Sequence, residues 1–453
     1  MDREIVRVRP GIAGPGLGLA VDLGSTTIAA FLSRLDDGEI VGTAAMMNPQ
    51  VAFGEDVMSR ISYCLDQADG LDRLRRVVID GLNGLIGEAL AEAAAAAGLG
   101  PGFNRADIED LALCGNTTMQ HLLLGLDPSG LGTLPFTPAA RRGLTFKARD
   151  LGLEVNPSAN IFIAPAVSGF VGGDAVCATL AEAPHLDEKI TLIIDIGTNG
   201  EIILGNKDRL LSASCATGPA LEGARIEFGM RAAPGAIERV RIDPATLEVD
   251  YKVVGREPWR SFSAPGDMKV HGICGSGILD ALAEFRLAGI INPSGAFNHD
   301  CPSSRLRKNP ETGIWEFVLA PAPETALGRD VVVTLKDIRQ VQLAKAALYA
   351  GCRLLLRKMG VERPDRIKIA GAFGFHIDRR LALVLGLFPR VPLEAVLSVG
   401  NAAGDGCRLA LLDRAKRREA DELAQRIEHV ELNLEKDFQQ ELIAAIHIPP
   451  LTD

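Results

Sequence analysis

Aromatic residues are scarce in this chain, with 16 Phe, 3 Tyr and 2 Trp among 453 residues. Proteins that bind single-stranded nucleic acid stack bases on aromatic side chains, so this scarcity argues against such a surface. An excess of basic residues is also missing, because the formal net charge is −10. A chain of this charge is repelled by a phosphate backbone, and we therefore expect no nucleic-acid partner.

Long hydrophobic runs and cysteine motifs are missing as well. No apolar run approaches the roughly 20 residues that span a membrane, and the opening MDREIVRVRPG contains no apolar core of a signal peptide. We expect a cytoplasmic protein without a membrane partner. The eight cysteines lie tens of residues apart with no C-x-x-C pair. This spacing predicts buried, reduced thiols and no iron–sulfur cluster in this chain.

The chain does contain enough apolar material for a large core, since 47% of its residues are hydrophobic and 23% are charged. Its length predicts about three compact units or two large lobes. Residues 1–16 carry no helical or strand period and are predicted to be a linker or tail, either a natural N-terminus or the remnant of a longer chain. Strand patterns begin at Leu17, Asp37-Gly38 indicates a hairpin turn, and helical patterns follow over 72–97.

An internal repeat is the most informative feature of the sequence. The segments VDLGSTTIAAFL (21–32) and IDIGTNGEIILG (194–205) align without gaps at an offset of 173 residues. Each copy has the pattern of an apolar strand, a glycine turn with hydroxyl side chains and a second strand. A unit duplicated at this spacing predicts two similar lobes and excludes a short-period solenoid.

The two aspartates that the repeat aligns, Asp22 and Asp195, indicate a nucleotide site. A carboxylate inside an apolar strand is costly unless it is paired, hydrogen-bonded or close to a metal ion. Glycine turns expose backbone N–H groups that hold phosphate oxygens, and carboxylates suit Mg²⁺. We expect the two turns to clasp the phosphates of one nucleotide, with both aspartates positioning hydrated Mg²⁺ for catalysis. In a single hairpin, an aspartate that only shapes the turn would explain the pattern as well.

Five segments resemble the motifs of the actin/Hsp70/sugar-kinase ATPase superfamily, in the order of that superfamily. They look like phosphate 1 (DLGSTT, 22–27), connect 1 (PAVSGFVGGDAVCATL, 165–180), phosphate 2 (DIGTNGE, 195–201), the adenosine motif (IAGAFG, 369–374) and connect 2 (SVGNAAGDGCRLALL, 398–412). Each motif alone is weak, but five in order form a specific signal. The resemblance implies an α/β, two-lobed actin-like (ribonuclease H-like) fold, with a mixed five-stranded sheet in each lobe and a nucleotide cleft between the duplicated lobes.

Three further segments resemble a narrower family, the reductive activators of corrinoid-dependent methyltransferase systems. They are CGNTTMQHLLLGLDP (114–128), ATGPALEGARIEFGMRAAPGAIE (216–238) and GICGSGILDALAEFRLAGII (272–291). Members of that family typically carry an iron–sulfur domain and use ATP to drive reduction of a Co(II) corrinoid to Co(I). The resemblance implies ATP and Mg²⁺ as cofactors and a corrinoid protein as partner. Because this chain has no cluster motif, it also implies an external or upstream iron–sulfur electron donor, and a homodimer is compatible with it.

The candidate nucleotide-binding residues lie in turns and at the starts of helices. They are Gly24, Ser25, Thr26, Thr27, Asn116, Thr117, Gly197, Thr198, Asn199, Gly218, Glu222, Gly275, Gly371 and Gly374. Several have a purely local explanation: the hydroxyls shape their turns, Asn116 caps a helix, Glu222 is a first-turn carboxylate, and the glycine at 275 permits close helix packing.

Asp174 is the third catalytic candidate. It follows two glycines and precedes an apolar helical run, so it either orients the attacking water or caps that helix. The seven histidines show no metal-binding spacing. His376 follows the adenosine-like turn and is the one histidine that merits a test.

These segments predict lobe I over 17–184 and lobe II over 185–400. A last part, 401–453, contains connect 2, packs back on the lobes and includes a charge-dense exposed helix within 413–438. We expect an ATP hydrolase, slow without its partner, that couples lobe closure to activation of a corrinoid protein. Two alternatives share the predicted fold: a small-molecule kinase and an ATP-dependent actin-like assembly protein.

Overall fold

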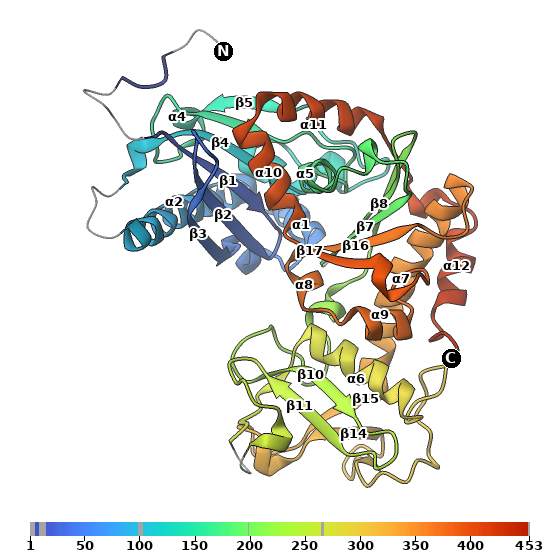
Figure 1. The fold of residues 1–453 in the computed structure, drawn as a ribbon. Coiled ribbons are helices and arrows are strands. Elements are labelled where there is room, and N and C mark those ends of the chain that lie inside the picture. The colour runs from blue at the N-terminus through green and yellow to red at the C-terminus, as the bar shows by residue number, and fades with distance from the viewer. Residues whose placement is uncertain (1–4, 9–14, 98–102, 198, 264–266, 452–453) are drawn as a thin grey trace. The chain divides into compact units, whose positions relative to one another are not determined.

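The computed structural model describes residues 5–8, 15–97, 103–197, 199–263 and 267–451, and the chain divides into two compact units (Figure 1). Unit 1 is made of Met1–Glu188, Gly205–Ser212 and Asn401–His429, and unit 2 of Lys189–Leu204, Ala213–Gly400 and Val430–Asp453. The described part of the predicted linker contains no helix or strand. No described helix combines the length and the apolar character that a membrane crossing requires.

The main sheet of unit 1 has six strands in the order β3-β2-β1-β4-β6-β5. Its strands are β1 (Leu17–Leu23), β2 (Thr27–Arg34), β3 (Ile40–Met47), β4 (Ile108–Gly115), β5 (Leu144–Lys147) and β6 (Asn160–Ile163). The first three strands form an antiparallel meander, which confirms the predicted hairpin. Strand β4 runs parallel to β1 and to β6, whereas β5 pairs antiparallel at the edge.

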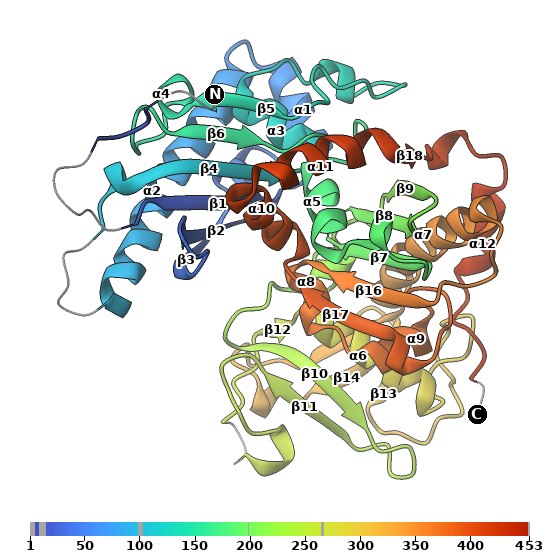
Figure 2. The same ribbon diagram turned by 45° about the horizontal axis from the view of Figure 1, so that its top comes forward.

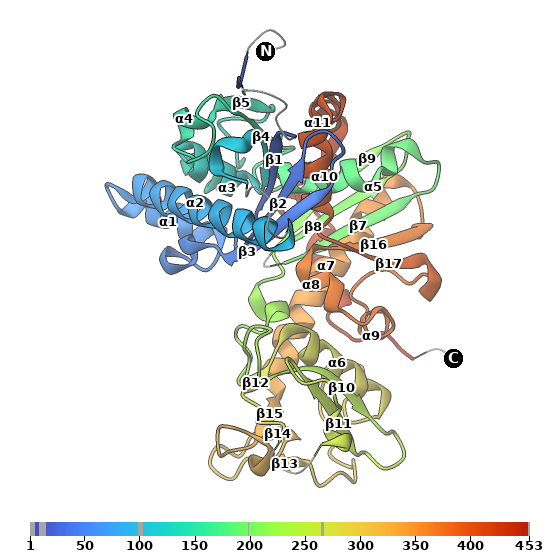
Figure 3. The same ribbon diagram turned by 60° about the vertical axis from the view of Figure 1, so that its left-hand side comes forward.

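Alternation along β1 directs its side chains into two different layers. Val21 belongs to the hydrophobic core cluster together with leucines of helix α2 (Gly70–Ala97), which confirms the helix predicted over 72–97. Gly18 faces the other layer, where an added Cβ would meet a leucine of helix α10 (Ala402–Leu412) at 3.0 Å. Figure 3 shows α2 and α10 on different sides of β1 and β2. Asp22 has the same parity as Gly18 and therefore faces the α10 layer.

The helices that carry the connect motifs touch each other within unit 1. Helix α5 (Gly173–Glu182) carries connect 1, and α10 carries connect 2. A Cβ added to Gly406 of α10 would lie 1.8 Å from the carbonyl oxygen of Cys177 on α5. Backbone therefore packs directly on backbone at this crossing.

The remaining helices of unit 1 are α1 (Val57–Asp66), α3 (Thr117–Leu124), α4 (Ala148–Leu151) and α11 (Arg414–Arg426). Helix α11 confirms the predicted exposed helix, since only three of its residues are buried. The predicted exposed segment DRAKRREADELAQRIE (413–428) agrees with α11 to within two residues at its end, where the chain turns into strand β18 (Ile427–His429). That strand pairs in parallel with β9 (Leu210–Cys215).

The second large sheet has the order β17-β16-β7-β8-β9-β18. Its other strands are β7 (Thr191–Ile196), β8 (Gly200–Gly205), β16 (Arg366–Ala370) and β17 (Val396–Gly400). Both large sheets thus have six strands, and the expectation of five was too low. The edges explain the difference, because an edge strand exposes unpaired N–H and C=O groups that a further segment can use. Strand β5 pairs at an edge of the first large sheet, and β18 pairs at an edge of the second.

Unit 2 contains two small sheets that the sequence analysis did not predict. One has the order β11-β10-β12 and the other β13-β14-β15, and Figure 2 shows them beside helix α6. Their strands are β10 (Ala236–Ile242), β11 (Val249–Val253), β12 (Gly272–Ile273), β13 (Leu306–Lys308), β14 (Trp315–Ala320) and β15 (Val331–Thr334). The helices of unit 2 are α6 (Gly275–Leu287), α7 (Leu335–Met359), α8 (Gly371–His376), α9 (Arg379–Leu385) and α12 (Phe438–Ala445).

Candidate functional site

The phosphate 1 segment forms the turn between β1 and β2. Asp22 lies near the end of β1, with its Oδ1 3.9 Å from the Sγ of Cys114. Gly24 begins the turn, and a Cβ there would lie 2.4 Å from the carbonyl oxygen of Thr27, the first residue of β2. Ser25 and Thr26, between them, are partly exposed. The arrangement is the strand, glycine turn and strand that the repeat predicts.

The loop after β4 contacts this turn through Asn116. Its Nδ2 donates a hydrogen bond to Ser25 Oγ at 2.7 Å. Its Oδ1 accepts one from the Met119 N–H at 3.0 Å and so caps helix α3. The local explanation of this residue is therefore correct, and the contact with the phosphate turn exists beside it. Thr117 donates through Oγ1 to the Ser168 carbonyl at 2.6 Å, which joins the loop to connect 1.

Asp174 lies in the first turn of α5, where the N-cap is Gly172. Of the two alternatives for Asp174, the one in which it caps the helix is therefore wrong. Its Oδ1 accepts a hydrogen bond from the Ala175 N–H at 2.8 Å, and the residue is partly exposed. A carboxylate in a first helical turn is stabilised by the helix dipole.

In unit 2 the phosphate 2 aspartate lies against the adenosine turn. Asp195 on β7 pairs in parallel register with Ala370 on β16. A Cβ on the next residue, Gly371, would lie 2.3 Å from Asp195 Oδ1, and φ of Gly371 is +86°. Both observations require glycine there. Gly374 likewise packs tightly, because its Cβ would lie 2.7 Å from the Ile369 side chain.

Burial raises the pKa of Asp195 to about 6. A carboxyl group that loses water on folding gains most from a nearby cation, which restores its charged form. Oxygen ligands of this kind suit Mg²⁺. Across the residues that the structure describes, no three or more His, Cys, Asp or Glu side chains group to hold a metal ion. The candidate ligands of Mg²⁺ are the single carboxylates of Asp22 and Asp195.

The loops after β7 and β9 complete this part of unit 2. The Gly197 carbonyl accepts a hydrogen bond from Thr217 Oγ1 at 3.1 Å, and the Gly197 N–H donates to the Asn199 carbonyl at 3.1 Å. A Cβ on Gly197 would lie 3.9 Å from Glu222 Oε1, so the structure brings Glu222 to the phosphate 2 turn. Gly218 has φ of +69° and open space around it. Thr198 lies outside the described residues.

The glycines at the start of α6 are explained by close packing. A Cβ on Gly277 would lie 2.2 Å from the Ile237 carbonyl oxygen, and Gly275 is buried at the first position of the same helix. The structure thus supports the packing explanation for this segment.

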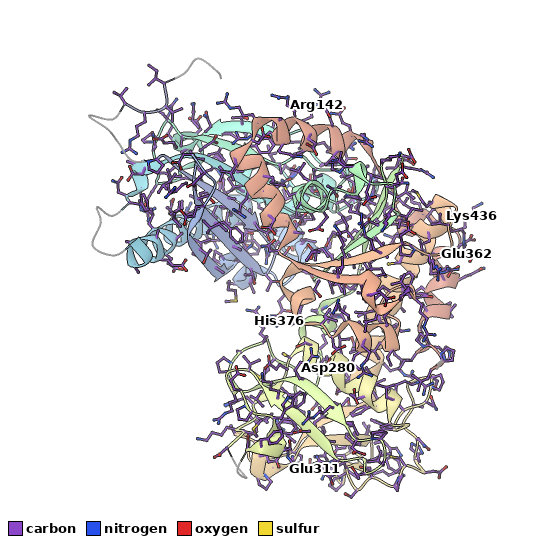
Figure 4. The ribbon with its side chains drawn as sticks, viewed as in Figure 1. Arg142, Asp280, Glu311, Glu362, His376 and Lys436 are labelled. Carbon is purple, nitrogen blue, oxygen red and sulfur yellow. The ribbon has the colours of Figure 1, made fainter. Side chains whose placement is uncertain are left out.

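His376 ends helix α8, and its side chain is exposed. Its carbonyl accepts a hydrogen bond from Arg239 Nη1 at 3.1 Å, and Arg239 Nε lies 3.0 Å from Asp280 Oδ2 on α6; Figure 4 labels His376 and Asp280. Burial raises the pKa of Asp280 to about 7. This network ties the adenosine-motif helix to α6, and no sequence pattern pointed to it.

The cysteines are all free thiols, and six of the eight are buried. This outcome confirms the prediction of buried thiols for those six. Cys64 and Cys301 are partly exposed.

Two further residues, Asn48 and Arg60, contact the phosphate 1 turn and were missed by the sequence analysis. Both are completely buried polar side chains. The sequence analysis predicted no helix over α1 (Val57–Asp66), which buries Arg60 beside Val57 and Ile61. Had this helix been predicted, a charged residue on its apolar face would have been the available signal.

Two family models together match almost the whole chain. The one described as "RACo middle region" matches residues 17–187, and the "C-terminal domain of RACo the ASKHA domain" matches residues 189–453.

Two curated proteins and one solved structure are similar to the chain. The corrinoid activation enzyme RamQ of Eubacterium limosum is 37% identical over 432 residues, which cover 94% of this chain and 69% of that protein. A [Co(II) methylated amine-specific corrinoid protein] reductase of Methanosarcina barkeri is 24% identical over 430 residues, covering 90% and 72%. The structure of a reductive activator for corrinoid, iron-sulfur protein matches with a TM-score of 0.83 at 39% identity, covering 97% of this chain and 67% of that one.

Proposed function

This chain belongs to the RACo family of corrinoid activators, and from that premise we propose that it binds Mg-ATP, hydrolyses it slowly and promotes reduction of a Co(II) corrinoid protein to Co(I). The same matches confirm the predicted family and the mixed α/β, actin-like fold. The names of the relatives concern corrinoid activation. Nucleotide hydrolysis and its coupling to that activation belong to the proposal.

The observation that carries the proposal is the pair of equivalent aspartates, each beside a glycine turn at the end of a central strand. We call Asp22 with the turn 24–27 and Asn116 the unit 1 half-site. Asp195 with Gly197, Glu222 and Gly371 is the unit 2 half-site. The duplication supports a common task for the two, namely holding the phosphates of one nucleotide.

The two half-sites and Asp174 have separate roles in this proposal. Backbone N–H groups of the two turns hold phosphate oxygens, and Asp22 and Asp195 hold a hydrated Mg²⁺. When bound, this ion neutralises the charge that develops on the phosphates. Asp174 accepts a hydrogen bond from the attacking water, orients it and takes up its proton. Gly371 leaves room for the nucleoside beside the backbone.

We propose that ATP binding closes the two lobes, as the resemblance implies. A ligand shifts a conformational equilibrium only through its different affinity for the two states. ATP can therefore favour the reducible corrinoid only if the closed lobes bind the corrinoid protein differently from the open ones. The electron comes from an iron–sulfur donor other than these 453 residues, because their cysteines form no cluster motif.

Calorimetry with Asp22→Asn and Asp195→Asn tests the nucleotide site. We expect each change to weaken Mg-ATP binding at least tenfold, about 1.4 kcal/mol, because it removes one charge from the magnesium site. Asp208→Asn, in an exposed turn, is the matched control and should bind as the wild type does. Wild-type affinity and turnover in both half-site variants would remove the assignment.

A further inference from the structure

We propose that Asn48 and Arg60 are positioning residues that orient the phosphate 1 turn, so that its N–H groups are directed toward the phosphates of the nucleotide. The inference rests on the proposed function, and it deepens that function by adding residues outside the five motifs.

The first step is the direction of three successive carbonyl groups in the turn. The Gly24 carbonyl accepts a hydrogen bond from Asn48 Nδ2 at 2.8 Å, and the Thr26 carbonyl accepts one from the Asn48 backbone N–H at 2.9 Å. Between them, the Ser25 carbonyl accepts from Arg60 Nη2 at 2.5 Å. All three carbonyls are thus bonded to donors from the buried side of the turn.

The second step follows from the planar trans peptide, in which a C=O and the next N–H point in opposite directions. The N–H groups that follow the three carbonyls, those of Ser25, Thr26 and Thr27, therefore point away from Asn48 and Arg60. Asn48 and Arg60 are 0% exposed, whereas the turn itself is partly exposed. A row of N–H groups turned outward in this way forms an anion-binding concavity.

The third step is the charge of Arg60. Its other partners are the Gly54 carbonyl at 2.9 Å, Met119 Sδ at 3.0 Å and Gln50 Oε1 at 3.4 Å. Every one of these partners is neutral. Burial lowers the pKa of Arg60 to about 10, and the charge of Asp56 offsets only part of that effect. A buried cation without a directly bonded carboxylate is costly, so an anion on the outer side of the turn would compensate it.

The fourth step connects these residues to the rest of the half-site. Met119 Sδ contacts Arg60 Nη1 and lies 3.6 Å from Asn48 Nδ2. The Met119 N–H is the donor to Asn116, and Asn116 in turn donates to Ser25. Donors thus hold the turn from the buried side and through its serine hydroxyl. A neutral side chain of similar length would fill the same space as Arg60, but it would supply neither the charge nor the hydrogen bond to Ser25.

Binding of Mg-ATP and of inorganic tripolyphosphate by the full chain tests the proposal. We expect Arg60→Met to weaken the binding of both ligands by tenfold or more, because both bind to the phosphate turn. Arg60→Lys keeps the charge and should recover part of the loss, which a role in packing alone would not predict. Arg73→Met, at an exposed arginine of α2, is the control and should leave both affinities unchanged.

Asn48→Asp is a second, isosteric variant that keeps the oxygen accepting from Gln50 and removes the donor to Gly24. Asn48→Asp should weaken the binding of tripolyphosphate by a similar factor. Wild-type affinity for tripolyphosphate in folded Arg60→Met, or in Asn48→Asp should the former not fold, would overturn the inference. A wild-type chain that binds neither ATP nor tripolyphosphate would instead overturn the proposed function.

Discussion

At the scale of single residues, Lys345 is a buried amino group whose charged form is destabilised by burial. It lies on α7, is 3% exposed, and donates through Nζ to the His447 carbonyl at 2.6 Å. Burial lowers its pKa from 10.5 to about 8. The neighbouring Gln342 donates to the Ile446 carbonyl at 3.0 Å, so both side chains bind the C-terminal segment to α7 within unit 2.

Replacing Lys345 by Met should remove a pH dependence of stability. Because the folded pKa is below the unfolded one, the contribution of Lys345 is fully present above pH 10.5 and is lost as the pH falls toward 8. The free energy of unfolding should therefore change by about 3 kcal/mol at most between these two pH values. Denaturation followed by tryptophan fluorescence measures it, since both tryptophans, Trp259 and Trp315, belong to unit 2. Exposed Lys336 on the same helix is the control, and a variant Lys345→Met that keeps the dependence would contradict this account.

Asp174 allows a second prediction at this scale. Its N2 position in α5 leaves the capping role to Gly172, so removing the carboxylate should not release the start of the helix. We expect Asp174→Ala to bind Mg-ATP nearly as the wild type does and to lose the partner-stimulated hydrolysis, as measured by phosphate release. An unchanged stimulated rate would reduce Asp174 to a first-turn carboxylate.

At the scale of elements, the crossing of α5 and α10 brings two helix backbones into direct contact within unit 1. Both helices carry connect motifs, and they meet at Gly406 and Cys177 without room for a side chain. Glycine permits such an approach because it has no Cβ to separate the two backbones. A glycine inside a helix normally costs about 1 kcal/mol relative to alanine. The close packing of Gly406 against Cys177 explains why glycine stands at this position.

Gly406→Ala should therefore destabilise the chain although alanine favours helices. The new Cβ would meet a backbone oxygen at 1.8 Å, and relief requires one helix to move, at a cost of about 3 kcal/mol. Gly84→Ala at an exposed position of α2, where no atom lies within 4 Å of the new Cβ, should instead stabilise the chain by up to about 1 kcal/mol. Thermal unfolding followed by circular dichroism compares the two, and equal stabilities would show that the crossing can relax.

At the scale of the whole molecule, the chain is two units that each carry one half-site of the proposed nucleotide site. Two family models divide at nearly the same position, 187 and 189, where unit 1 first gives way to unit 2. The function proposed for the molecule requires both units, since neither half-site alone supplies both aspartates.

The chain with ATP but without an electron donor should leave a Co(II) corrinoid protein unreduced, because the spacing of its cysteines predicts no iron–sulfur cluster in these 453 residues. Adding a low-potential iron–sulfur donor should produce Co(I), which is measured by its absorbance. The control contains ADP in place of ATP. Pull-downs with candidate corrinoid proteins should show a complex that differs between an ATP analogue and ADP. No nucleotide-sensitive complex, together with a phosphorylated small molecule, would favour the kinase alternative.

The sequence by itself determined the features that repeat or alternate over short distances. The aspartates at 22 and 195, the hairpin at Asp37-Gly38 and the helix over 72–97 were readable because each depends on a local period or on a duplicated pattern. The superfamily and family followed from motifs in order, and the matches confirm them.

Only the tertiary structure decided which distant residues meet. Arg60 reaches Ser25 across 35 positions of the chain, and Cys407 lies beside Val21 across 386. The strand at Ile427–His429 pairs with β9, more than 200 positions away in the chain. Burial and strand pairing depend on segments far apart in sequence, so no local pattern encodes them, and the cost of burying Lys345 and Arg60 became visible only in the packed chain.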